Sequence, residues 1–473
     1  MSSFLILMKQ ELLVAVILFI LLFLKLGSKE WKSESLLNFI NFLLLINLVA
    51  GFFPAIGGTG AATEGKLFGE MFRTNMLITL EKNILNLGVL IISLQSFSWL
   101  RNHKHIAEFY MLLLSTLLGM FFMISSNNIL MFYLGLELSS IPLAAMCNFD
   151  LEKRVSSEAA FKFIMSSAFS SGLLLFGISL LYGTTGSLNF PEISQHLDGS
   201  VLQIFAFILL IAGFGFKISA VPFHLWTADV YEGSPVATTS YLSVISKGAI
   251  LFVFVSVLYN VFGQMETSWY SMIFLISVIT MIIGNLFALR QQNMKRFLAF
   301  SSIAQVGFIL VGISGSSVAG SASVIFFIMI YVFSNLGAFG VISVVSAITG
   351  RERVDDYRGF YKTNPLLAWV LTISLFSLAG IPPTAGFFGK FFLIMAGAGK
   401  GNYVLIVIAA LNMVVSLYYY LRVVKAMFMD ANENPIERVE SNTMEKLSFA
   451  ICMGGIVITG LASGAYQYIY SLF

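Results

Sequence analysis

Apolar stretches of about 20 residues recur along nearly the whole chain of 473 residues, and this pattern limits its fold more than any other feature. About fourteen such stretches occur, each long enough for an α-helix to cross a bilayer. Lipid cannot satisfy backbone polar groups, so stretches of this length must be helical. The sequence therefore predicts an all-α polytopic membrane protein with about fourteen transmembrane helices. Their centres are expected near residues 15, 45, 90, 116, 138, 172, 212, 249, 279, 306, 334, 378, 416 and 460.

The composition agrees and excludes several classes of protein. Hydrophobic residues make up 58% of the chain, charged residues 11%, and the mean hydropathy is +0.88. A net charge of +3 is too small to indicate a nucleic-acid partner. Cys147 and Cys452 lie far apart without a Cys-x-x-Cys motif, so neither a disulfide framework nor an iron–sulfur site is expected. The first apolar stretch lacks a small-residue cleavage site and is expected to remain as the first helix.

Lysine and arginine residues indicate the orientation of the chain. They concentrate in the loops that follow odd-numbered helices, as at Arg101, Arg290 and Arg422, whereas the loops after even-numbered helices are nearly bare. Loops rich in these residues usually face the cytoplasm. An even number of helices returns both termini to one side, so both are expected on the outer side. The loop pattern and chain length favour a bacterial inner membrane.

Five charged residues lie inside or at the edges of the apolar stretches. They are Glu137, Lys162, Lys217, Lys247 and Lys390. A charge at the centre of a bilayer costs roughly 3 kcal/mol on insertion scales. Ionisable residues retained in such positions usually serve ion or proton transfer, and they are the primary candidates for a functional site.

Proline is expected to interrupt two of these helices. Pro222 follows Lys217 in helix seven, and Pro382 and Pro383 precede Lys390 in helix twelve. Proline frees backbone groups that lipid cannot satisfy, so broken helices are expected beside a hydrated path. Helix seven is the fourth of helices 4–8 and helix twelve the fourth of helices 9–13, which indicates two inverted five-helix repeats.

One membrane domain, 1–473, is therefore expected. It comprises helices 1–3 in residues 1–100, the first repeat in 107–262, the second repeat in 268–428, and a cytoplasmic loop with helix 14 in 429–473.

The segment 217–235, KISAVPFHLWTADVYEGSP, resembles a known family. Its Pro-Phe-His-x-Trp core is similar to that of the antiporter-like membrane subunits of proton-pumping NADH-quinone oxidoreductase, respiratory complex I. The continuation DVYEGSP resembles the subunit N family, although Ala228 stands where proline is common. LSVISK at 242–247 and LAGIPPTAGFFGK at 378–390 resemble the family's lysine-bearing eighth and broken twelfth helices. The likeness spans nearly the whole chain.

The resemblance implies roles for the buried charges. Glu137 would pair with Lys217, Lys247 would be the central lysine of a proton path, and Lys390 would release the proton to the outside. His224 would relay protons and Lys162 would take them up. The alternatives are a structural Glu137–Lys217 ion pair, snorkelling lysines that fill gaps, and a histidine that caps a helix end. Making or breaking the Glu137–Lys217 pair would change the pKa of the lysine. A change of about two pKa units is worth about 2.7 kcal/mol, comparable with the roughly 2.3 kcal/mol needed to move one charge through 100 mV.

The function implied is a proton-translocating membrane subunit that couples quinone reduction elsewhere to proton transfer from cytoplasm to exterior. NADH, FMN, iron–sulfur clusters and quinone would belong to partner subunits, with no cofactor or redox centre in this chain. The expected partners are other complex I membrane subunits, including antiporter-like neighbours, and the bilayer. Alternatives are a subunit of a sodium/proton antiporter or membrane-bound hydrogenase, and a non-pumping scaffold. Because cation sites favour carboxylates, four lysines and one glutamate favour protons.

Overall fold

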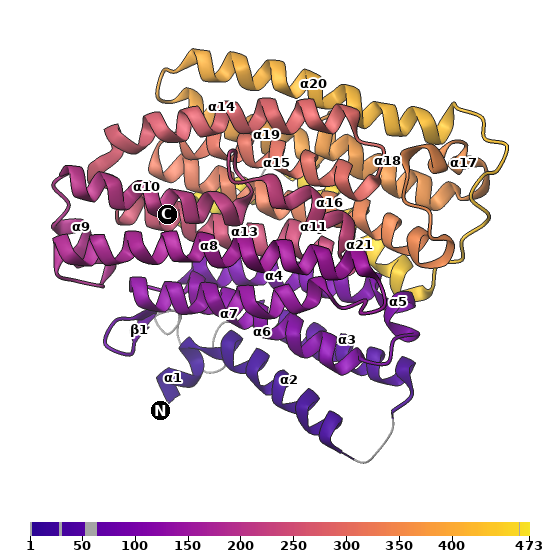
Figure 1. Ribbon diagram of the computed structural model, residues 1–473, viewed down its shortest axis with the longest axis horizontal. Coiled ribbons are helices and arrows are strands. Elements are labelled where there is room, and N and C mark those ends of the chain that lie inside the picture. The colour runs from indigo at the N-terminus through magenta and orange to yellow at the C-terminus, as the bar shows by residue number, and fades with distance from the viewer. Residues whose placement is uncertain (1, 28–30, 53–63, 463) are drawn as a thin grey trace.

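The chain forms a bundle of long helices that lie side by side (Figure 1). The structure is a computed structural model and describes residues 2–27, 31–52, 64–462 and 464–473. Within these residues, 12 helices are long and apolar enough to cross a membrane, and two shorter apolar helices lie among them. The predicted all-α polytopic membrane fold is confirmed.

The N-terminal fifth of the chain lies mostly along one side of the bundle (Figure 1). A two-stranded antiparallel hairpin in this part pairs Lys66 with Arg73. The end of the bundle that carries this hairpin is called the hairpin end below. The elements here are α1 Ser2–Leu7, α2 Lys9–Leu26, α3 Ser33–Phe52, β1 Gly65–Leu67, β2 Phe72–Thr74, α4 Met76–Gln95 and α5 Phe97–Arg101.

The next part contains the first interrupted helix. The break separates α10 from α11 and holds Pro222, as predicted. A π-helical turn, Tyr241–Ser246, joins α12 directly to α13. The helices are α6 Ile106–Ile124, α7 Ile129–Cys147, α8 Arg154–Thr185, α9 Phe190–Gln195, α10 Val201–Ile218, α11 Leu225–Gly233, α12 Val236–Ser240 and α13 Lys247–Asn260.

The C-terminal half contains the second interrupted helix. It is split into α18 and α19 around Pro382 and Pro383, also as predicted. Single 3-10 turns occur at Gly263–Met265 and Val354–Tyr357. The helices are α14 Glu266–Arg290, α15 Met294–Ile313, α16 Ser317–Thr349, α17 Phe360–Thr363, α18 Pro365–Ala379, α19 Ala385–Ala398, α20 Tyr403–Phe428, α21 Thr443–Leu461 and α22 Gly464–Ser471.

Asparagine residues start several of the long helices. The side chains of Asn75, Asn128, Asn293 and Asn402 each accept a hydrogen bond from a backbone N–H of the first turn, and Asn442 forms a reciprocal capping box with Glu445. An asparagine cap satisfies amides that would otherwise lack partners at a helix start. These caps position α4, α7, α15, α20 and α21.

Burial separates central from peripheral helices. The apolar windows of α15 and α16 are each 94% buried, whereas those of α20 and α21 are each 33% buried. Exposed large side chains on the outer helices, such as Phe169 and Tyr418, present an apolar surface suited to lipid. Lys247 of α13 and Lys390 of α19 lie deep inside the bundle, with exposures of 3% and 1%.

Each of the fourteen predicted centres falls within a helix, the twelfth near the end of α18. The exact count of fourteen transmembrane helices and their grouping into two inverted repeats stay predictions, as do the domain limits.

Candidate functional site

Lys217 lies in the last turn of α10, directly before the first helix break. Its ammonium donates hydrogen bonds to Ser140 Oγ and Ser167 Oγ, both at 2.7 Å. Ser140 belongs to α7 and Ser167 to α8, so three helices meet at this lysine. Neither serine was predicted as part of the site.

Glu137 does not form the predicted ion pair with Lys217 in this structure. It lies on α7 one turn before Ser140, and its Oε1 atom is buried without a hydrogen-bond partner in the described chain. The ammonium instead donates two of its three N–H groups to the two serine hydroxyls. The structure therefore shows the pair open, because neutral oxygens of α7 and α8 lie closer to the lysine than the carboxylate does.

The residues around the first break satisfy its backbone groups. The Ala220 amide donates to the Gly215 carbonyl at 2.8 Å, and the Trp226 indole donates to the Phe216 carbonyl at 3.1 Å. Ser219 ends α10 with a left-handed φ of +64°. His224 follows in the break, half-buried, and its Nδ1 atom is buried with no hydrogen-bond partner among the described residues. The Pro-Phe-His-x-Trp motif thus supplies both the break and its internal hydrogen bond.

Lys247 begins α13 directly after the π-helical turn. Its ammonium donates to Ser302 Oγ of α15 at 2.7 Å and lies 5.3 Å from the centre of the Tyr231 ring. A π-helical turn inside a longer helix frequently marks a functional position. Here it ends at the residue before the lysine.

Lys390 lies in α19, and its ammonium binds the end of α18 across the second break. It donates to the carbonyl oxygens of Leu378 at 2.7 Å and Ala379 at 3.2 Å, and lies 4.8 Å from the Phe308 ring centre. The last carbonyls of a helix carry partial negative charge and lack helical partners. The break that proline creates therefore supplies the acceptors for this lysine.

A glutamine lies on α15 between the contacts of the second and third lysines. Gln305 lies one turn after Ser302 on α15, and its amide donates to Leu378 O at 2.9 Å and to Tyr420 Oη at 3.1 Å. Polar groups thus lead from Lys247 through Ser302 and Gln305 to the acceptor of Lys390. Ser302 and Gln305 were not predicted as site residues. Their three-residue spacing within an apolar helix is the sequence signal that could have found them.

The three lysines share one environment. The exposures of Lys217, Lys247 and Lys390 are 8%, 3% and 1%. Each ammonium is held by uncharged oxygens, and none lies within ion-pair distance of a carboxylate in the described ranges. A buried charge without a counter-charge costs several kcal/mol. Their protonation is therefore sensitive to any change in the charge nearby.

Lys162 lies apart from this row, at the end of the bundle opposite the hairpin. It is half-exposed and binds Glu158 at 2.8 Å and Asp229 at 2.7 Å. Asp229 also binds Arg296 at 2.7 Å, which in turn binds Glu232. Three helices, α8, α11 and α15, are joined by this cluster.

The chain is similar to known proteins over nearly its whole length. Residues 126–416 match the family described as NADH:quinone oxidoreductase/Mrp antiporter, TM, a range that holds all six candidate residues. NADH-quinone oxidoreductase subunit N of Phocaeicola vulgatus is 45% identical over 460 residues, which is 96% of this chain and 95% of that protein. Subunit N of Azobacteroides pseudotrichonymphae is 44% identical over 477 aligned residues, which cover 100% of this chain and 98% of that protein.

A solved structure shares the fold over the same extent. A chain of respiratory complex I from Thermus thermophilus with bound aureothin superposes with a TM-score of 0.81 and 26% identity. The superposition covers 96% of this chain and 97% of that chain.

Proposed function

The chain belongs to the family of NADH-quinone oxidoreductase subunit N, and we propose that it moves protons across the membrane as a subunit of such an enzyme. The observation that carries the proposal is the set of three buried lysines on neutral oxygens. Ser302, which binds Lys247, and Gln305, which shares the Leu378 carbonyl with Lys390, lie three positions apart on α15. Groups of this kind hold and pass protons when a neighbouring charge changes.

Each residue has a proposed part in the transfer. Glu137 attracts and releases the Lys217 ammonium, Lys247 carries the proton along the centre, and Lys390 releases it. The open Glu137–Lys217 arrangement supports the first role, because a pair that switches must be stable when separated. Ser140 and Ser167 stabilise the separated ammonium. Lys162 and His224 are proposed as secondary members of the path, for uptake and relay.

The proposed direction is from cytoplasm to exterior, with the hairpin end outside. The charged cluster of Lys162, Asp229 and Arg296 lies at the opposite end, in agreement with the lysine and arginine bias of the loops. Figure 1 draws α1 and the C-terminal end toward the same end as β1, which supports two outer termini. A bacterial inner membrane is the proposed location of this multi-pass protein.

NADH, FMN, iron–sulfur clusters and quinone are proposed to belong to partner subunits. The partners of this chain would be further membrane subunits of complex I, some of them antiporter-like. Proton transfer here would respond to quinone reduction through charge along the row of lysines.

A sodium/proton antiporter subunit is the second candidate, because the matching family includes Mrp antiporters. A sodium site requires several oxygen ligands around one position, commonly with carboxylates. The oxygens around the three lysines are instead occupied by ammonium groups. This chemistry favours protons. A scaffold without transfer is the third reading.

Replacing Lys217 by alanine in the assembled complex tests the proposal. NADH oxidation with quinone and proton pumping are measured in sealed vesicles after the subunit's presence is confirmed. We expect pumping to collapse, whereas Lys400→Ala, an exposed lysine paired with Glu266, should match wild type. Wild-type pumping with Lys217→Ala would support the scaffold reading. Sodium-dependent pumping would support the antiporter reading.

A further inference from the structure

A second buried charge cluster lies near the hairpin end and takes no part in the row of lysines. Lys82 of α4 and Glu11 of α2 form an ion pair at 2.5 Å, and both are almost completely buried. The Lys82 ammonium lies 5.4 Å from the Phe72 ring centre and 5.8 Å from that of Phe121. Lys82 thus has both a counter-charge and aromatic contacts, and its ion pair links α2 to α4.

Glu81, the neighbouring residue on α4, has no such partner. It is 7% exposed, and its carboxylate forms neither an ion pair nor a hydrogen bond within the described part of the chain. The charges that act on it most strongly are those of Arg73 and Lys82, from beyond ion-pair distance. A carboxylate buried in a membrane helix without a partner is costly and usually functional.

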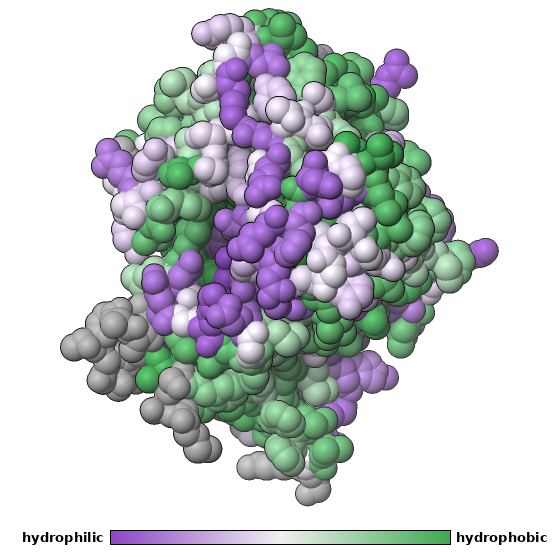
Figure 2. Space-filling view, turned by 90° about the vertical axis from the view of Figure 1, so that its left-hand side faces the viewer, coloured by the Kyte–Doolittle hydropathy of each residue, from purple (hydrophilic) through white to green (hydrophobic). Residues whose placement is uncertain are grey.

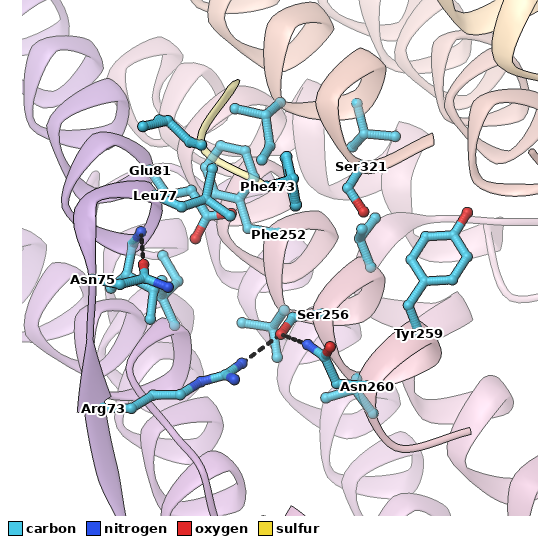
Figure 3. A pocket seen from close by; sticks show the side chains of 18 of the residues that line it. Arg73, Asn75, Leu77, Glu81, Phe252, Ser256, Tyr259, Asn260, Ser321 and Phe473 are labelled. Carbon is cyan, nitrogen blue, oxygen red and sulfur yellow. Dashed lines mark hydrogen bonds between the residues drawn. The ribbon is translucent and has the colours of Figure 1, made fainter. Parts of the chain in front are cut away.

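Glu81 lines a cavity of about 370 Å³ between α4, α13 and α16 (Figure 3). Arg73 donates to Ser256 Oγ at 2.6 Å, and Asn260 donates to the same oxygen at 3.1 Å, so these three residues form a row across the cavity. Asn260 and Ser317 in the lining are exposed, which opens the cavity toward the hairpin end. Figure 2 shows that end from outside, with a polar band across its centre between apolar margins.

The packing of α4 against the segment that holds Lys247 fixes the level of Glu81 in the bundle. A Cβ on Gly248 would lie 3.6 Å from Leu85, and one on Gly88 would lie 2.3 Å from Ile245, so α4 and α13 pack side by side in opposite directions. Glu81, Leu85 and Gly88 share one face of α4 by their spacing. Glu81 precedes Leu85 by about 6 Å along the helix, toward the hairpin end. It therefore lies between the level of Lys247 and the open cavity.

We propose that Glu81 is a proton-release group that gives this subunit an outlet at the hairpin end, separate from Lys390. The inference rests on the proposed function and deepens it. The Lys247 ammonium gives a proton to water, and that proton adds to a carboxylate oxygen of Glu81. The acid then gives it to water in the cavity and becomes a carboxylate again. Only N–H and O–H bonds break and form.

Arg73 has a defined part in this outlet. Its guanidinium lies in the cavity, anchored on Ser256 of α13, and its Nε atom is buried without a hydrogen-bond partner in the described residues. A fixed positive charge in a narrow polar passage raises the barrier to protons and other cations. Arg73 therefore keeps a fixed positive charge in the cavity through which the proton leaves Glu81, and this charge limits the entry of other cations from outside.

The test compares three variants in the assembled complex in sealed vesicles: Glu81→Gln, Glu81→Asp and Lys247→Ala. We expect Glu81→Gln to lower proton pumping roughly tenfold, less than the ~100-fold effect of losing a sole proton carrier, because Lys390 remains as an outlet. Glu81→Asp should recover most of the loss. Glu70→Gln, which removes an exposed carboxylate of the hairpin, is the control and should pump at the wild-type rate.

Two outcomes separate this inference from the proposed function. If Glu81→Gln pumps protons normally while Lys247→Ala loses pumping, the proposal that Glu81 releases protons is wrong, but the proposed function of the subunit stands. Normal pumping by Lys247→Ala would overturn the proposed function itself. Difference infrared spectra during turnover supply a readout that a structural role would not change, because a carboxylic C=O band should be missing in Glu81→Gln. An unchanged spectrum would also overturn the outlet.

If Glu81→Gln does not assemble, a cysteine at the mouth of the cavity provides the test. Asn260→Cys can be modified from outside with a membrane-impermeant thiol reagent, and the native Cys147 and Cys452 are both buried. We expect modification to lower pumping. Full modification without any effect on pumping would overturn the outlet.

Discussion

Gln305 and Lys390 donate to the same acceptor, the carbonyl oxygen of Leu378, at 2.9 and 2.7 Å. That carbonyl is free because α18 ends there, before the two prolines. The broken helix therefore does more than make room for water. It presents one backbone oxygen through which α15, carrying the contact to Lys247, is linked to α19, carrying Lys390.

Replacing Gln305 by leucine should interrupt this link. We expect pumping to fall about five- to tenfold, the equivalent of one net hydrogen bond of about 1–1.5 kcal/mol. The subunit should still assemble, because leucine fills a similar volume. Gln291→Leu is the matched control, since its amide only donates to a carbonyl within α14. A Gln305→Leu complex that pumps at the wild-type rate would contradict a role for the link.

The serine pair around Lys217 supports a second prediction. A hydrogen bond to a charged group contributes about 1.5–3 kcal/mol. The double change Ser140→Ala and Ser167→Ala should therefore weaken proton uptake by Lys217 and slow pumping by at least about tenfold. The comparison is Ser139→Ala, a neighbour on α7 whose hydroxyl donates only to Leu136 O. Equal rates in both variants would show that the serines do not stabilise the ammonium.

Much of this arrangement follows from sequence and some of it does not. The two helix breaks and the burial of Lys217, Lys247 and Lys390 follow from prolines and charges in apolar stretches, and the structure confirms them. The hydrogen-bond partners of these lysines could not be predicted from the sequence. Serine in a membrane helix usually bonds a carbonyl of its own helix, so nothing in the sequence distinguished Ser167 from its neighbours.

The buried charges of α2 and α4 could not be predicted from the sequence, for a different reason. Glu11, Glu81 and Lys82 stand near helix ends, where charged side chains commonly reach water. The burial of Glu11 and Lys82 depends on a contact between α2 and α4, 71 positions apart in the sequence, and that of Glu81 on the packing of α13 and α16. Local pattern carries no information about such a contact.

The charged cluster at Asp229 should stabilise the subunit. Its carboxylate binds Lys162 and Arg296 and so joins α8, α11 and α15. These side chains are partly exposed, and such pairs contribute up to about 1 kcal/mol each, so Asp229→Asn should cost about 1–2 kcal/mol. The measurement is the temperature at which the subunit is lost from the purified complex on native gels.

The control for this experiment is Asp355→Asn, which removes an exposed pair with Arg358 three residues away. A local pair of this kind contributes little. High salt should narrow the difference between Asp229→Asn and wild type, because exposed charges are screened. An Asp229→Asn complex as heat-resistant as wild type at low salt would show that the cluster does not hold the helices together.

Close packing of α6 on α7 gives the last prediction. A Cβ on Gly119 would lie 2.5 Å from the backbone nitrogen of Ser139, and one on Gly135 would lie 2.8 Å from Gly119 O. Backbone cannot move aside as a side chain can, so Gly119→Ala should separate the two helices at a cost of about 1–3 kcal/mol. Glu137 and Ser140 lie on α7 beside this contact, so the Lys217 site should shift and pumping should fall with the amount of assembled subunit. Gly172→Ala in α8 is the matched control, because its Cβ would meet open space and alanine favours the helix. Assembly and pumping are measured for both, and full activity of Gly119→Ala would refute the close approach of α6 and α7.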